Sequence, residues 1–81
     1  MIHFDVVIPA LHSELEFCCG PEEKVRDLIH KMLVLLTGKK KLRIEKEEEF
    51  TLYCMRSACM LEKGATVGKC NIRTGDRLIL V

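Results

Sequence analysis

The sequence lacks a long hydrophobic run and an excess of charge of either sign. Its longest uninterrupted apolar stretch, Met32 to Leu36, is far short of the ~20 residues that a membrane-spanning helix needs. Thirteen Lys and Arg residues stand against 12 Asp and Glu residues, so no overall field attracts nucleic acid or an anionic membrane. A signal peptide begins with a basic region, and the first residues of this sequence have none. We therefore expect a cytoplasmic protein with no direct membrane insertion and no nucleic-acid partner.

The sequence also lacks the motifs that mark catalytic and metal centres. It has no Gly-rich phosphate loop, no nucleophile beside a base in a recognisable motif, and no C-x-x-C pair. His3, His12 and His30 are not paired with a thiol at metal-binding spacing. A domain of 81 residues leaves little room for a substrate pocket. These absences predict a protein that is not an enzyme and has no cofactor and no metal.

The cysteines form a poor disulfide framework. Their number is odd, and the adjacent Cys18 and Cys19 would point to opposite faces of a strand. We interpret them as small apolar fillers in a reducing compartment. Thiol redox activity through Cys18 and Cys19 is the best enzymatic alternative, but no basic residue lies next to them to lower a thiol pKa. The five cysteines are Cys18, Cys19, Cys54, Cys59 and Cys70.

The first half of the chain predicts a hairpin followed by a helix. Apolar and polar residues alternate from Ile2 to Ile8, and again from Glu14 to Cys19, which indicates two antiparallel strands. The helix is expected to start at the Pro21 turn and to end at about Thr37, before Gly38. Its apolar stripe recurs at the helical period and consists of Val25, Leu28, Ile29, Met32, Leu33 and Leu36.

The second half predicts a charged loop and three further strands. Residues 39–49 are rich in charge and read as a solvated loop, anchored by Leu42 and Ile44. Alternation then predicts strands at residues 50–55 and 58–61, and a single turn at residues 66–72. A Thr74-Gly75-Asp76 turn precedes the strand formed by residues 77–81. The order ββαββ, short turn, β predicts one α+β domain over residues 1–81, with a mixed sheet of four to five strands packed on one main helix.

This pattern resembles the ubiquitin-like β-grasp fold along the whole chain. The segments HFDVVIP, VRDLI and CNIRTGDRLILV are similar to the small ubiquitin-like proteins of the YukD and EsaB type, which are associated with type VII (ESX, WXG100/ESAT-6) secretion in Gram-positive bacteria. The resemblance implies that the first and last strands lie parallel at the centre of the sheet. It also implies a non-catalytic accessory or regulatory protein that binds a protein component of the secretion machine.

The end of the sequence bears on conjugation. Ubiquitin and the sulfur carriers that share its fold use a flexible C-terminal extension ending in Gly-Gly, whereas this sequence stops at Val81, inside the expected strand. The resemblance therefore implies that the chain is not conjugated and carries no thiocarboxylate.

Alternation along the strands also defines a candidate protein-binding face. If one set of strand residues faces the helix, the other set lies on the open face of the sheet, where an apolar centre would have a charged rim. The apolar centre is Val7, Tyr53, Met55, Ile79 and Val81, and the rim is His3, Asp5, Glu14, Glu16 and Arg77. Scattered exposed apolar residues without a partner are the competing interpretation. A further competing interpretation is an adaptor outside secretion that binds its partner by pairing through an edge strand. The sequence does not indicate the oligomeric state.

Overall fold

The computed structural model describes residues 1–40 and 47–81, with the side chains of residues 37, 39, 40 and 47 left out. Much of the predicted loop 39–49, including Leu42 and Ile44, lies outside the described residues. The strands are β1 (Ile2–Ile8), β2 (Ser13–Cys19), β3 (Leu52–Cys54), β4 (Cys59–Met60) and β5 (Arg77–Leu80). The helix α1 spans Val25–Lys40, and short 3-10 helices form at Pro9–Leu11 and Glu47–Glu49.

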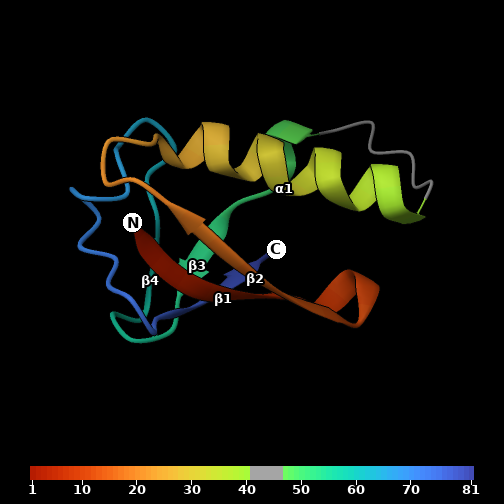
Figure 1. The fold of residues 1–81 in the computed structure, drawn as a ribbon, viewed down its shortest axis with the longest axis horizontal. Coiled ribbons are helices and arrows are strands. Elements are labelled where there is room, and N and C mark those ends of the chain that lie inside the picture. The colour runs from red at the N-terminus through yellow and green to blue at the C-terminus, as the bar shows by residue number, and fades with distance from the viewer. Residues whose placement is uncertain (41–46) are drawn as a thin grey trace.

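The five strands form one mixed sheet in the order β2-β1-β5-β3-β4 (Figure 1). β1 and β5 run parallel at its centre, with Val6 beside Leu78 and Val7 beside Ile79. The other pairs, β1 with β2, β3 with β5, and β3 with β4, are antiparallel. The predicted hairpin and the parallel pairing of the first and last strands are therefore confirmed.

The turn before β5 fixes the register of the central strands. Gly75 has a φ of 93°, a conformation that a residue with a Cβ rarely adopts. In this conformation its N–H donates to the His3 carbonyl at 2.8 Å, and the Asp5 N–H donates to the Asp76 carbonyl at 3.0 Å. The predicted Gly-Asp turn is thus present, and it joins β5 to β1.

The helix begins and ends later than the sequence predicts. Residues before Val25 do not continue the helix, because their backbone bonds to a distant segment: the Gly68 N–H donates to the Pro21 carbonyl at 2.8 Å. The first N–H groups of a helix have no partner inside it. Here those of Val25 and Arg26 donate to carbonyls of residues 65 and 63, at 3.0 and 3.1 Å. Gly38 lies within α1, so the prediction that it ends the helix is wrong.

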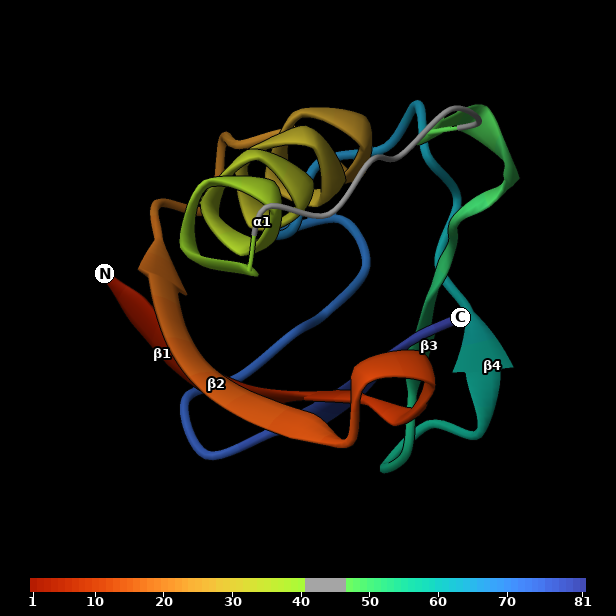
Figure 2. The same ribbon diagram turned by 90° about the vertical axis from the view of Figure 1, so that its right-hand side faces the viewer.

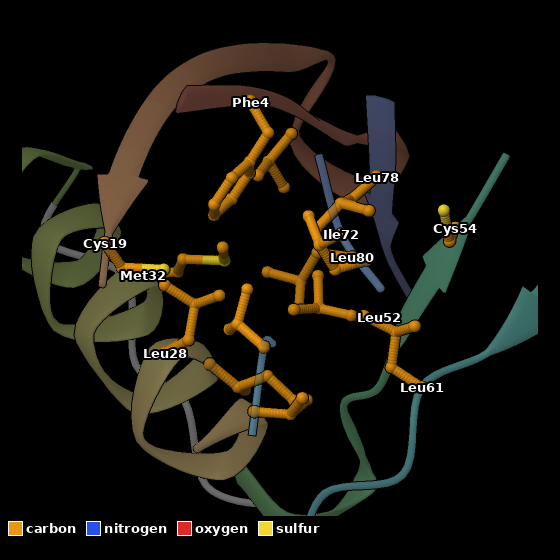
Figure 3. Close-up of a cluster of buried hydrophobic side chains, with 14 of the residues drawn as sticks. Phe4, Cys19, Leu28, Met32, Leu52, Cys54, Leu61, Ile72, Leu78 and Leu80 are labelled. Carbon is orange, nitrogen blue, oxygen red and sulfur yellow. The ribbon is translucent and has the colours of Figure 1, made fainter. Parts of the chain in front are cut away.

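The core lies between α1 and the concave side of the sheet. Figure 2 shows the sheet curving around one side of the helix. In Figure 3, Phe4 and Leu78 from the central strands point toward Met32 of α1. The core residues of the strands are Phe4, Val6, Ile8, Cys19, Leu52, Cys54, Leu78 and Leu80; those of α1 are Val25, Leu28, Ile29, Met32, Leu33 and Leu36; and those of the loops are Leu61, Val67 and Ile72. The predicted helix stripe is confirmed in full.

The remaining elements are shorter than predicted but lie where the sequence places them. β3 and β4 have three and two residues, and a turn follows Cys54. In segment 66–72, the Cys70 N–H donates to the Thr66 carbonyl at 3.1 Å, which makes the predicted single turn. Val67 and Ile72 are buried there. Within residues 1–40 and 47–81, no helix has both the length and the apolar character needed to cross a membrane.

Candidate protein-binding face

Three of the five predicted residues form a row across the open face of the sheet. Val7 of β1 lies beside Ile79 of β5, and Ile79 lies opposite Tyr53 of β3. All three are half-buried, whereas their neighbours along each strand are buried against the helix. The row continues onto β4, where Met60 lies opposite Tyr53 and is 54% exposed. We call Val7, Ile79, Tyr53 and Met60 the apolar row.

Met55 and Val81, the other two predicted residues, extend this face at its two ends. The Met55 N–H donates to the Arg77 carbonyl at 3.1 Å, so Met55 lies beside the start of β5. Val81 exchanges backbone hydrogen bonds with Thr51, at 2.7 and 3.0 Å, so it lies beside the start of β3. Both side chains are about half exposed, at 50% and 51%. The strand register and these backbone hydrogen bonds thus put all five residues on the side of the sheet opposite the helix.

Charged side chains line the β1 and β2 side of the apolar row. Arg77 of β5 reaches across β1 to Glu14 of β2, with Nη2 and Oε1 3.0 Å apart. Asp5 lies between Arg77 and Glu16 in the strand register. Both partners of the Arg77–Glu14 pair are about half exposed, so solvent screens their attraction. This side of the face is therefore polar and adaptable.

Sequence reasoning missed Arg56, which holds the turn after β3 against the start of β5. Its Nε donates to Asp76 Oδ1 at 2.8 Å and its Nη2 donates to Oδ2 at 3.1 Å. A second bond from Nη2 reaches the Asn71 carbonyl at 2.6 Å. Asp76 is buried, and it also accepts the Arg73 N–H at 2.8 Å. Twenty residues separate Arg56 from Asp76 in the sequence, and no local pattern joins them.

The Arg56–Asp76 pair shifts the pKa of both groups. The hydrogen bonds from Arg56 lower the pKa of the Asp76 carboxyl below its ordinary value, although burial acts in the opposite direction. The same hydrogen bonds raise the pKa of Arg56. Asp76 is therefore held as a carboxylate, and the pair joins the turn that follows Met55 to the residue that precedes Arg77.

Met60 was also missed as a member of the face. The sequence predicts a strand at residues 58–61 but not its register against β3, which puts Met60 opposite Tyr53. In the structure Leu61, next to Met60, is buried, and Met60 points to the opposite face. A Met side chain is flexible and polarisable, which suits an adaptable binding surface.

The structure separates the two adjacent cysteines. Cys18 is exposed and Cys19 is buried, as expected for neighbours in a strand. Burial, and then Glu23, raise the pKa of the Cys19 thiol. The interpretation of the cysteines as apolar fillers fits the buried Cys19 and Cys54, but it is wrong for Cys18 and Cys59, which are exposed. Among the described residues, no three His, Cys, Asp or Glu side chains are grouped as metal ligands would be.

A hollow of about 280 Å³ lies on the helix side of the molecule, lined by Arg26, Ile29, Glu48 and Lys63. Both of its cationic side chains are held by backbone carbonyls: Lys63 Nζ donates to Glu48, and Arg26 Nε donates to Lys63 at 3.5 Å. The hollow contains none of the residues that the sequence predicts for a site.

Comparisons with known proteins support the fold. No protein-family model matches the chain, and no curated protein matches it in sequence. Among solved structures, it is similar to ATBAG1 in a complex with HSP70, with 17% identity and a TM-score of 0.70. That match covers 100% of this chain and 40% of the ATBAG1 chain, so this chain spans less than half of that protein.

Two further structures have the same fold. The ubiquitin-like domain of an Arabidopsis thaliana protein matches with 16% identity and a TM-score of 0.74, covering 99% of this chain and 74% of that one. A de novo design based on ubiquitin matches with 18% identity and a TM-score of 0.72, covering 99% and 85%. The chain therefore has a ubiquitin-like α+β fold of the β-grasp kind, as the sequence predicted.

Proposed function

We propose that this chain is a non-catalytic accessory or regulatory protein of a type VII secretion system. We further propose that it binds a protein component of that machine through the open face of its sheet. The observation that carries the binding role is the apolar row, in which Val7, Ile79 and Tyr53 lie side by side on three adjacent strands. The link to secretion rests on the resemblance of the sequence to the YukD and EsaB type.

The composition of the open face supports docking of a protein. Its centre is apolar, with an aromatic ring at Tyr53, and its β1 and β2 side carries Asp5, Glu14 and Arg77. An apolar centre with a polar rim is the usual anatomy of a protein interface, and Tyr is among the residues enriched there. Met55 and Met60, each about half exposed, add side chains that can adjust to a partner.

A structure with the same fold supports this role in general terms. ATBAG1 was determined in a complex with HSP70. A sheet backed by a single helix offers a rigid platform, because the core on the helix side holds the strands in register. The side chains on the open face can then vary with the partner while the fold is kept.

The direct test replaces the centre of the apolar row by charge. Tyr53→Glu combined with Ile79→Glu should weaken binding to the purified cytoplasmic domains of the secretion ATPase of the FtsK/SpoIIIE type, or to the small helical-hairpin substrate, by more than tenfold. This expectation follows because the few residues that dominate an interface cluster at its centre and contribute ~2 kcal/mol or more each, and ~1.4 kcal/mol is tenfold in affinity. Titration calorimetry measures the affinity.

The matched control is Leu35→Glu. Leu35 is a large apolar side chain exposed on α1, away from the open face, so this change adds charge to exposed apolar surface without touching the apolar row. It should leave the affinity unchanged. Circular dichroism and thermal melting confirm that each variant is folded. Unchanged binding of the folded double variant would show that the apolar row is not the site.

The secretion assignment has its own test, which does not depend on the site. Genes that flank this one should encode a small helical-hairpin secretion substrate and an ATPase of the FtsK/SpoIIIE type. Deleting the gene should lower export of that substrate, and the wild-type gene should restore it. If neither protein is encoded nearby and export of such substrates is unaffected, the secretion role is wrong, while the binding role of the open face stands.

A second candidate, an adaptor outside secretion, is favoured by the position of β2. This seven-residue strand lies at one edge of the sheet, and no strand in the described part of the chain pairs with its outer side. An extended peptide could add to it through backbone hydrogen bonds. Binding of that kind should survive the Tyr53 and Ile79 changes, because they leave the β2 backbone intact, and this outcome would favour the adaptor.

A further inference from the structure

Two cysteines that the sequence separates by a turn are direct partners in the sheet. Cys54 ends β3 and Cys59 begins β4, and the antiparallel register places them opposite each other. Residues 55–58 form the turn between them. Side chains opposite each other in an antiparallel pair project from the same face, with Cβ atoms ~4.5–5.5 Å apart. The pair therefore has the basic arrangement of a cross-strand disulfide.

The backbone hydrogen bonds give the spacing of the two Cα atoms. The Leu61 N–H donates to the Leu52 carbonyl at 2.8 Å, which marks these two residues as a hydrogen-bonded pair. Because such pairs alternate along an antiparallel ladder, Cys54 and Cys59 form the next hydrogen-bonded pair, with Cα atoms ~5.5 Å apart. Disulfides join Cα atoms that are ~4.4–6.8 Å apart, which this spacing satisfies, and Cβ atoms that are ~3.5–4.5 Å apart. The two Cβ atoms of a hydrogen-bonded pair must therefore move about 1 Å closer for the bond to form, which strains the hairpin and makes the bond easier to reduce.

The two thiols differ in access in a way that suits stepwise oxidation. Cys59 is exposed, and its Sγ lies 3.2 Å from Ser57 Oγ. Cys54 is fully buried and lies at the far side of the core from Cys19 (Figure 3). A reagent in solution therefore reaches Cys59, and the strand register places Cys54 opposite Cys59. We propose that Cys54 and Cys59 are a reversible oxidation site, which closes a disulfide across the β3–β4 hairpin when a small-molecule disulfide such as glutathione disulfide is present.

The reaction consists of two thiol–disulfide exchanges. The Cys59 thiolate attacks one sulfur of glutathione disulfide, so that a Cys59–glutathione bond forms, the original S–S bond breaks, and one glutathione thiolate leaves and takes up a proton. Cys54 then gives up its proton and attacks the Cys59 sulfur, which forms the Cys54–Cys59 bond, breaks the Cys59–glutathione bond, and releases the second glutathione as a thiolate that takes up the proton. Two protein thiols are oxidised, and one glutathione disulfide is reduced to two thiols.

Cys70 is the competing partner for Cys59. It is half-buried, and burial raises the pKa of its thiol, with smaller contributions in the same direction from Cys59 and Cys54. The strand register holds Cys54, and not Cys70, opposite Cys59. Cys18 and Cys19 lie on β2, at the other edge of the sheet. We therefore expect the product to be the Cys54–Cys59 bond.

Peptide mapping tests this assignment, because trypsin separates the candidate thiols. Cleavage after Arg56, Lys63, Lys69 and Arg73 puts Cys54, Cys59 and Cys70 on three different peptides. The full chain is incubated with glutathione disulfide at neutral pH, denatured, alkylated and digested. The expected result is a link between the peptide ending at Arg56 and peptide 57–63, with the number of alkylated cysteines falling from five to three.

Three results would overturn the proposal: a link from peptide 57–63 to the Cys70 peptide, a stable glutathione adduct on Cys59 with Cys54 still alkylated, or no loss of either thiol. Cys70→Ser is the matched control and should retain the link, while Cys59→Ser should abolish it. Cys59 is exposed, so its replacement leaves the core intact, and circular dichroism confirms the fold. Adding excess dithiothreitol to the oxidised protein should restore all five thiols.

Discussion

The two faces of the sheet come from the same strands, yet they differ in what they contribute. On the helix side, Val6, Leu78 and Leu52 are completely buried, whereas Val7, Ile79 and Tyr53, their neighbours along the chain, are only half-buried on the open face. Buried aliphatic area contributes most of the stability of a small domain. The comparison indicates that the helix side of the sheet contributes most of the stability and that the open face contributes less.

The largest expected effect separates the two faces within one strand. Leu78→Ala removes a fully buried side chain from the core and should lower the free energy of unfolding by ~2–5 kcal/mol. Ile79→Ala removes a half-buried side chain from the open face and should cost about 1 kcal/mol. The cost is smaller because the truncation removes less buried apolar area and because solvent can occupy the space that is left. Urea denaturation of the two variants measures both values.

This pair of variants tests whether the two faces of the sheet differ in their contribution to stability. Equal losses at Leu78 and Ile79 would mean that the open face contributes as much to folding as the helix side. In that case a binding defect caused by changes in the apolar row would have to be attributed to unfolding. Similar urea m-values for both variants and the wild type are needed for the comparison, since they show that the same surface is exposed on unfolding.

A second prediction concerns the Arg56–Asp76 pair, which connects the end of β3 to the start of β5. Arg56→Ala removes the two hydrogen bonds that a charged side chain donates to the buried Asp76 carboxylate, and leaving that carboxylate short of partners should cost ~1–3 kcal/mol. Arg56→Lys should recover only part of this loss, because an ammonium group cannot make the same paired contact. Thermal and urea unfolding provide the measurement. No loss on removal of Arg56 would mean that Asp76 is satisfied by the backbone alone.

The pH dependence of stability sharpens this prediction. The pKa of Asp76 is lowered in the folded chain, so the folded state favours the carboxylate. Its contribution to stability is complete above the ordinary Asp pKa of ~3.9, and it is lost as the pH falls from there through the lowered folded value. The stability difference between the wild type and Asp76→Asn should therefore shrink as the pH falls below about 4. A difference that stays constant down to pH 2 would contradict the assignment.

The architecture was predictable from the sequence because it depends on local patterns of residues. The contacts between distant segments were not predictable in this way. Period-two alternation found β1 with its observed bounds, and the helical stripe of α1 was found completely. The start of α1 was predicted too early, because the bond between Pro21 and Gly68 is invisible in the local sequence. The same reason applies to the Arg56–Asp76 pair.

The candidate face was partly predictable for a related reason. Alternation alone placed Val7, Tyr53 and Ile79 on the same face, and the structure brings them together in one row. It could not reveal that Met60 joins the row or that Cys59 lies opposite Cys54, because both facts depend on the register of β4 against β3. Register is fixed by the length and shape of the turn as well as by the pattern of residues.

The smallest expected effect is at the charged side of the open face. Arg77 and Glu14 make a pair at 3.0 Å, but both side chains are about half exposed. Glu14→Gln should therefore change the free energy of unfolding by less than about 0.5 kcal/mol, and added salt should reduce even this difference. Urea unfolding at low and high ionic strength measures it. A loss as large as that of Arg56→Ala would show that a cross-strand ion pair on the open face helps to hold the sheet together. In that case the open face, and not only the helix side, would contribute substantially to the stability of the sheet.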